Sequence, residues 1–279
     1  MGKPTLAGPH DDPERKRHGF GATVILAAFA GLMIDLGLPV GRLRNISPGT
    51  QALLTAGAGG VILFLIFDVL QQAVEPVSVD LEAAAHGTGP ISSFAIDALI
   101  LGASIAFGLL SVTWITVRMR RGAASSTPML PRQLALGTAV GLGLHNFSEG
   151  LAIGQSSATG ATSLALILVI GFALHNATEG FGIAAPLASG ELPSWRFLGV
   201  MGLIGGGPTF VGGGVGYSFV SPLLSIAFLG LAAGALVFVF NEMMAVSRRM
   251  AVPMMATTAL LIGLLAGFGT DFILTAAGT

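Results

Sequence analysis

Eight apolar runs, each long enough to cross a lipid bilayer, constrain this chain more than any other feature of its sequence. A transmembrane helix needs about 20 predominantly apolar residues. Only 10% of the 279 residues are charged, whereas soluble domains carry about 25%. The sequence therefore predicts an all-α membrane protein, a bundle of about eight transmembrane helices. The runs cover roughly residues 20–41, 50–75, 93–117, 132–156, 161–187, 196–217, 220–247 and 252–277.

Glycine and cysteine content narrow the chemistry of this bundle. The 41 glycines favour close helix packing in lipid, where small residues let two backbones approach. The absence of cysteine excludes disulfides, thiolate ligands and thiol catalysis. Any bound metal must therefore use nitrogen and oxygen ligands. A net charge of −1 without a basic stripe gives no sign of a nucleic-acid partner, so the expected surroundings are the lipid bilayer.

The chain divides into a short polar segment and one apolar domain. Residues 1–18 contain three prolines and a charged stretch, which predicts a disordered N-terminal tail. Residues 19–279 form the predicted eight-helix transmembrane domain. Arg15–Arg17 ahead of an apolar run are also typical of a signal peptide. The run continues past Ala30 for about ten more residues, which favours a retained first helix.

Basic residues in the interhelical loops predict the orientation in the membrane. They fall on one side only: Arg42, Arg44, Arg118, Arg120, Arg121, Arg132, Arg196, Arg248 and Arg249. Cytoplasmic loops carry the excess of Lys and Arg, so both termini are expected outside, although the four basic residues of the tail oppose this. The longest predicted loops, 76–92 outside and 118–131 inside, are too short for a soluble catalytic domain. We therefore expect a protein that is not an enzyme.

The fourth and fifth apolar runs share a polar motif thirty residues apart. Both read Leu-His-Asn-x-x-Glu-Gly, at residues 144–150 and 174–180. Residues i and i+4 lie on one face of a helix, so His145 pairs with Glu149 and His175 with Glu179. A charged side chain near the bilayer centre costs roughly 2.5–3.5 kcal/mol and is usually functional.

Two adjacent antiparallel helices can bring both motifs together into one polar cluster. Two carboxylates in a low dielectric repel each other unless a cation or protons neutralise them. Imidazole with carboxylate suits Zn²⁺, Fe²⁺ or Mn²⁺, whereas Ca²⁺ and Mg²⁺ prefer oxygen alone. The alternative is that these side chains only hydrogen-bond between helices. The predicted metal ligands are His145, Asn146, Glu149, His175, Asn176 and Glu179.

Other acidic residues inside the apolar runs are weaker candidates. Asp68 is either a further ligand or entry residue, or an acid at a helix end. Glu242 is a candidate gate or proton site on the seventh run. Asp35, Asp97 and Asp271 are interpreted as structural or interfacial.

The paired His-Asn-x-x-Glu-Gly motifs resemble those of the ZIP (Zrt/Irt-like) family of metal transporters, and of its bacterial GufA-like branch in particular. The resemblance implies eight helices with both termini outside and a metal site, often binuclear, on the fourth and fifth helices. It also places Gly207, just before Pro208, where the family usually has Glu, and so implies that one carboxylate of a second metal is missing. Ser148 and Thr178 stand where the family often has Pro, which predicts straighter helices.

These observations together predict a divalent transition-metal transporter, with Zn²⁺ as the expected substrate and Fe²⁺, Mn²⁺ or Cd²⁺ as further candidates. Metal would move toward the cytoplasm across the cell (inner) membrane. No cofactor is expected, because the metal is the substrate. An intramembrane metalloenzyme and a non-transporting metal sensor are the alternatives, and a homodimer is an open alternative to a monomer.

Overall fold

The computed structural model describes residues 19–44, 46–119, 130–189, 191–219, 221–249 and 252–276. The predicted tail, residues 1–18, and the loop arginines Arg120 and Arg121 lie outside the described residues. Within the described ranges the chain is helical and contains no strand. The prediction of an all-α membrane bundle is confirmed.

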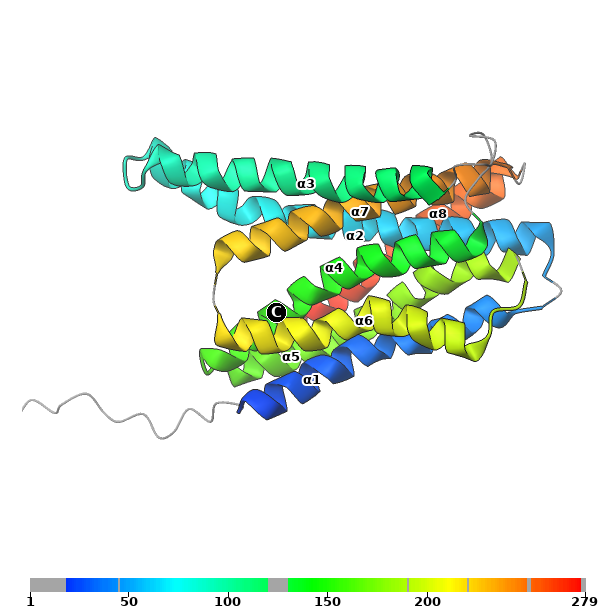
Figure 1. Cartoon of the computed structure of the whole chain (residues 1–279), viewed down its shortest axis with the longest axis horizontal. Helices are drawn as coiled ribbons and strands as arrows, with labels where there is room; N and C mark the ends of the chain where they lie inside the picture. Colours follow the sequence, from blue (N-terminus) through cyan, green and yellow to red (C-terminus); the bar gives the residue numbers. More distant parts are fainter. Residues whose placement is uncertain are drawn as a thin grey trace, which may run out of the picture.

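Eight long helices run nearly parallel to one axis of the molecule (Figure 1). Their bounds are α1 Phe20–Leu32, α2 Pro48–Ala85, α3 Ile91–Met119, α4 Pro131–Ala158, α5 Thr162–Ala184, α6 Trp195–Ser218, α7 Pro222–Arg249 and α8 Pro253–Ala276. Three short 3₁₀ segments extend two of them, with η1 Met33–Leu36 and η2 Leu38–Arg42 after α1, and η3 Ala185–Ser189 after α5. The predicted spans and the observed helices agree in number and order.

Two boundaries differ from the prediction, and one span that contains helix-breaking residues is continuous. The outer loop predicted at 76–92 is wrong, because α2 continues through Pro76 to Ala85, where alanine and acidic residues are adequate helix formers. The first span ends as an α-helix at Leu32 and reaches Arg42 through η1 and η2. The sixth span, with its Gly-Gly-Gly-Pro sequence, is one continuous helix despite Pro208.

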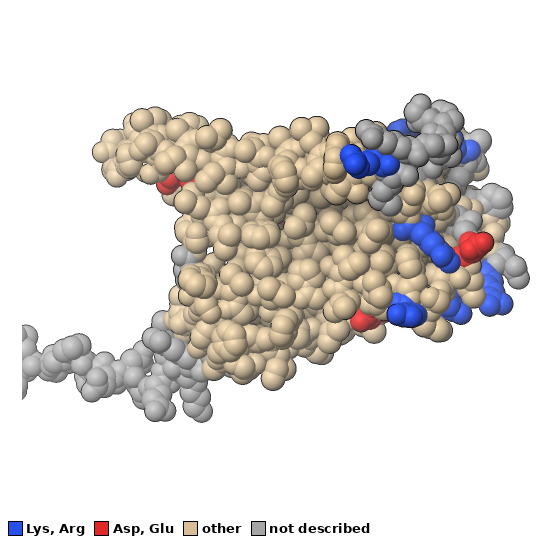
Figure 2. All heavy atoms as spheres, in the orientation of Figure 1, with Lys and Arg blue, Asp and Glu red and all other residues tan. Residues whose placement is uncertain are grey.

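The arginines of the described chain gather at one end of the molecule, here called the basic end (Figure 2). They lie where helices end or begin: Arg42, Arg44, Arg118, Arg132, Arg196, Arg248 and Arg249. The start of α1 and the end of α8 lie at the opposite end, here called the terminal end (Figure 1). The loop charges therefore meet on one side, as the positive-inside rule requires of a cytoplasmic face.

Glycines bring α6 into close contact with both α4 and α1. A Cβ at Gly150 of α4 would overlap the Thr209 carbonyl oxygen, and one at Gly212 of α6 would overlap the Phe147 carbonyl oxygen. Gly206 of α6 and Gly31 of α1 face each other in the same way. In lipid, helix association depends on such close backbone approach. The glycines thus fix the spacing of the helices around α4.

Helix α4 is the most polar of the eight. The other seven helical segments are both long and apolar enough to span a membrane, whereas α4 is long enough but less apolar. It packs against α1, α5, α6 and α7, and about half of its residues are buried, including His145, Asn146 and Glu149. These neighbours shield its polar side chains from lipid, as the cost of intramembrane charge requires.

Candidate metal centre

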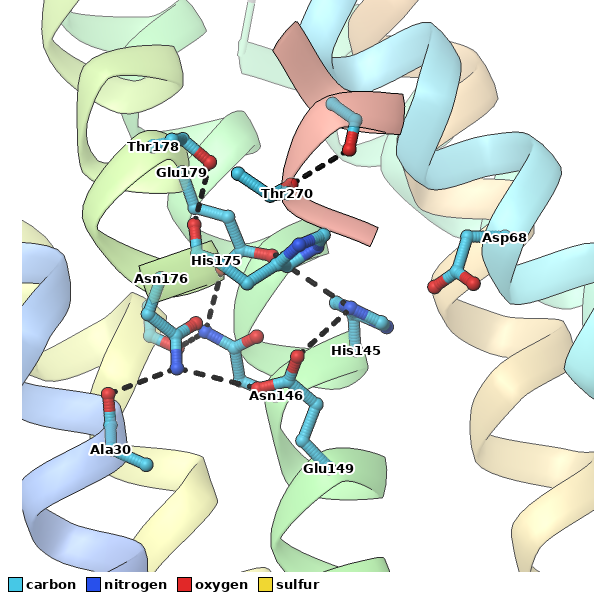
Figure 3. A network of polar contacts seen from close by, with 12 residues as sticks. Ala30, Asp68, His145, Asn146, Glu149, His175, Asn176, Thr178, Glu179 and Thr270 are labelled. Carbon is cyan, nitrogen blue, oxygen red and sulfur yellow. Dashed lines mark hydrogen bonds and ion pairs between the residues drawn. The ribbon is translucent and has the colours of Figure 1, made fainter. Parts of the chain in front are cut away.

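The two motifs meet because α4 and α5 form an antiparallel hairpin. Residues 159–161 connect the helices, and Gly160 adopts φ 77°, a left-handed conformation that glycine accepts without strain. The motif on α4 therefore faces the motif on α5 (Figure 3).

Four side chains form the four-residue cluster, defined as His145, Glu149, His175 and Glu179. Each offers one ligand atom, and these atoms all lie within 4.8 Å of one another. All four residues are at most 5% exposed. Four nitrogen and oxygen donors from two helices are therefore collected in one buried volume.

The distances inside the cluster are close to those of a coordination site. His145 Nε2 lies 3.5 Å from Glu149 Oε1 and 3.7 Å from Glu179 Oε1. His175 Nε2 also lies 3.7 Å from Glu179 Oε1. Zinc–ligand bonds of about 2.0–2.2 Å place tetrahedral ligands about 3.4 Å apart. Small side-chain movements would therefore let an ion reach these ligands.

The nitrogen atoms of both histidines that face the cluster lack hydrogen bonds within the described chain. Nε2 of His145 and Nε2 of His175 are buried and make no hydrogen bond. Glu179 Oε1 is likewise buried without one. Buried polar atoms are almost always hydrogen-bonded, so three such atoms in one volume indicate a site that receives a ligand.

The two asparagines cross-link the motifs instead of lying beside their own histidines. Asn146 Nδ2 of α4 donates to Glu179 Oε2 of α5 (2.9 Å) and to the Gly205 carbonyl of α6 (3.1 Å). Asn176 Nδ2 of α5 donates to Glu149 Oε2 of α4 (3.3 Å) and to the Ala30 carbonyl of α1 (3.0 Å). Each amide orients the glutamate of the other motif (Figure 3).

The amide oxygens remain open for coordination. Asn146 Oδ1 and Asn176 Oδ1 are both buried and have no hydrogen-bond partner in the described chain. An amide nitrogen donates hydrogen bonds and does not bind cations, so only the oxygens can bind one. The sequence prediction that both asparagines are ligands stays a prediction, and the geometry restricts it to Oδ1.

A cavity of about 220 Å³ reaches the cluster from the terminal end. Glu149 and His175 lie at its base, and Asp68, Gln72 and Asp271 also line it, together with Phe64, Ala152, Leu168 and Phe172. Helix α5 runs from the terminal end toward the basic end, so Leu168 and Phe172 lie on the terminal side of His175. The cavity thus opens toward the side predicted to be outside.

Apolar side chains pack on the other side of the cluster. Leu142 of α4, Ile183 of α5 and Ile62 of α2 are fully buried members of the main hydrophobic core. Leu142 and Ile183 lie nearer the basic end than the motif residues of their own helices, and Ile62 lies nearer that end than Asp68 of the same helix, α2. The cluster is therefore approached from the terminal side and backed by close packing toward the basic end.

The structure places the three residues predicted to line a path or gate, Asp68, Glu242 and Gly207, in different surroundings. Asp68 lies at the cavity, and its carboxylate is on the side of α2 that faces the histidines (Figure 3). Glu242 is half-buried on α7, outside the four-residue cluster. At Gly207 a Cβ would meet only the Leu203 side chain, at 3.2 Å, and no atom of the cluster within 4 Å.

Sequence reasoning missed three contributors to the site. Asp271 was interpreted as structural or interfacial, yet it lines the cavity with Asp68. The Ala30 and Gly205 carbonyls accept hydrogen bonds from the asparagines. A backbone carbonyl carries no residue-type signal, so only the three-dimensional contacts could identify these two.

A scan against protein-family models and a search of curated proteins give no match to this sequence. The fold and the site nevertheless define a class. The chain is a multi-pass helical membrane protein with a buried His/Glu cluster compatible with a metal site.

Proposed function

We propose that this protein transports divalent transition-metal ions, Zn²⁺ first among them, through the four-residue cluster and toward the cytoplasm of a cell whose inner membrane it spans. The observation that carries the proposal is the cluster itself, with four ligand atoms within 4.8 Å of one another inside a membrane bundle. The motifs that resemble those of the ZIP family support the same function.

Charge supports a divalent cargo. Glu149 and Glu179 bring two carboxylates into a volume with little solvent, and their repulsion in a low dielectric is relieved by a cation of charge two. Two imidazoles favour a transition metal over Ca²⁺ or Mg²⁺. Asn146 and Asn176 hold the carboxylates in place, the role that outer-shell hydrogen bonds have in metal sites.

The cavity supports entry from the terminal end. Of the four cluster residues, Glu149 and His175 are the ones that line the cavity, so an ion that enters there reaches them before His145 and Glu179. It exchanges water for the four side chains and leaves toward the basic end after Leu142, Ile183 and Ile62 move apart. A membrane potential that is negative inside favours this direction by about 4.6 kcal/mol per 100 mV for a divalent ion.

Metal flux into proteoliposomes tests the proposal. Purified protein is reconstituted around a metal-sensitive dye, and Zn²⁺, Fe²⁺, Mn²⁺ and Cd²⁺ are supplied outside. Glu179→Gln and His175→Ala should abolish saturable flux. Their matched controls, Glu82→Gln and His86→Ala, change exposed residues at the terminal end and should keep wild-type flux.

Two results would overturn transport. Wild-type protein that binds Zn²⁺ stoichiometrically but passes none under any gradient would favour a sensor. Metal-dependent turnover of a substrate without flux would favour an intramembrane enzyme.

A further inference from the structure

Three carboxylates line the cavity that leads to the cluster, and two of them, Asp68 and Asp271, do not belong to the four-residue cluster. Asp68 of α2 and Asp271 of α8 line the cavity whose base is formed by Glu149 and His175. Asp68 and Asp271 are each half-buried, so both lie within reach of water. The cavity therefore has an acidic outer part and a mixed His/Glu base.

The two helices that carry these aspartates pack closely against each other. Helices α2 and α8 pack closely at glycines, since a Cβ at Gly263 would overlap the Gly57 carbonyl oxygen. Phe64 and Phe268 make an edge contact with ring centroids 5.0 Å apart. Gln72 Nε2 donates to Asp68 Oδ2 at 2.8 Å and fixes that carboxylate.

The base of the cavity independently indicates a cationic ligand. His175 is 5% exposed and lines the cavity, and its Nε2 makes no hydrogen bond within the described chain. The nearest carboxylate oxygen, Glu179 Oε1, is 3.7 Å away. A lone pair in this position is available to an ion that arrives through the acidic outer part.

Charge and volume distinguish this outer part from the cluster. One divalent ion balances Glu149 and Glu179 but leaves Asp68 and Asp271 unneutralised. A volume of about 220 Å³ is ample for an ion that keeps several of its waters, since one water needs only about 10–15 Å³ by this measure. Oxygen ligands with retained water suit a hard or borderline divalent cation.

We infer that Asp68 and Asp271, with Gln72, form an outer site that holds a partly hydrated divalent cation and loads the four-residue cluster. The loading role rests on the proposed transport function. The binding of a cation at the outer site does not depend on that function. The outer site differs from the cluster in having no nitrogen ligand, so it should bind more weakly and discriminate less between metals.

Binding of Mn²⁺ to the Zn²⁺-loaded protein tests the site. One equivalent of Zn²⁺ fills the cluster, because Zn²⁺ exceeds Mn²⁺ in affinity for nitrogen-containing sites. Added Mn²⁺ is then followed by the loss of its free-ion electron paramagnetic resonance signal, in purified full-length protein in lipid nanodiscs. Wild type should bind one Mn²⁺ per chain.

The variants make the test specific. The double variant Asp68→Asn with Asp271→Asn should lose this Mn²⁺ and keep the Zn²⁺. Asp80→Asn is the matched control, since Asp80 is also half-buried on α2 but lines a different cavity, and it should bind Mn²⁺ as wild type does. Equal Mn²⁺ binding by the double variant, or none by wild type, overturns the inference.

A flux measurement distinguishes the loading role of the outer site from transport itself. In proteoliposomes the double variant should raise the KM for metal about tenfold, as loss of electrostatic attraction predicts, with maximal flux unchanged. An unchanged KM would remove the loading role. Absence of flux in wild type would overturn the proposed transport while leaving the Mn²⁺ result to decide the outer site.

Discussion

At the scale of single residues, the asparagines carry more of the architecture than their position beside the histidines suggests. Each amide contacts a glutamate of the other motif and a carbonyl of a third helix. Asn146 thereby joins α4, α5 and α6, and Asn176 joins α5, α4 and α1. The carboxylates are pre-oriented before any ion arrives, which reduces the cost of binding.

Asn146→Ala should weaken Zn²⁺ binding by about 10–100-fold, the usual effect of losing an outer-shell partner. The substitution removes the hydrogen bond that orients Glu179 and also removes the free Oδ1. Affinity is measured by competition with a chromophoric chelator. Asn241→Ala, at an exposed position on α7, is the control, and equal affinities for the two variants would mean that Asn146 neither orients nor binds.

At the scale of helices, close glycine contacts decide how α6 sits against α1 and α4. Pro208 lacks the backbone N–H that would bond four residues back, yet α6 remains continuous from Trp195 to Ser218. Packing against two helices keeps the segment helical although its sequence contains two Gly-Gly-Gly runs and a proline. The glycines therefore act by removing side chains from the contact.

Gly206→Ala should destabilise the bundle by about 1–3 kcal/mol, as overpacking does in well-packed interiors. The new methyl group would overlap the Gly31 carbonyl oxygen. Gly199→Ala lies on the same helix, where a Cβ meets nothing within 4 Å, and it should leave stability unchanged or slightly higher. Thermal unfolding in detergent compares the two, and a destabilised Gly199→Ala with an unaffected Gly206→Ala would contradict this packing.

At the scale of the whole molecule, charge is separated along the bundle axis. The described arginines lie at the basic end (Figure 2), while the cavity that leads to the cluster opens toward the terminal end. The positive-inside rule thus predicts that the cavity faces outward. The orientation of the protein in the membrane and the side from which an ion enters both depend on assigning the basic end to the cytoplasm.

Single cysteines test this orientation, because the chain has none of its own. Glu82→Cys lies at the exposed end of α2, and Glu191→Cys lies at the basic end with a side chain 92% exposed. A membrane-impermeant maleimide should label Glu82→Cys on intact cells, and Glu191→Cys only after permeabilisation. The reverse pattern would invert the topology and turn the cavity toward the cytoplasm.

The sequence by itself determined the membrane bundle, the number of helices and the two motifs. The reason is that apolar length and i, i+4 spacing are local properties, and the cost of charge in lipid singles out His145, Glu149, His175 and Glu179. Local reasoning failed where helices extend beyond the hydrocarbon, as α2 does past Pro76.

Only the tertiary structure decided how the motifs are completed. It directed the amide nitrogens of Asn146 and Asn176 across the hairpin, left Gly207 out of contact with the cluster, and placed Asp271 beside the cavity with Asp68. These outcomes depend on which helices are neighbours and how closely glycines let them approach. Contacts between distant segments set that geometry, and a one-dimensional pattern does not contain it.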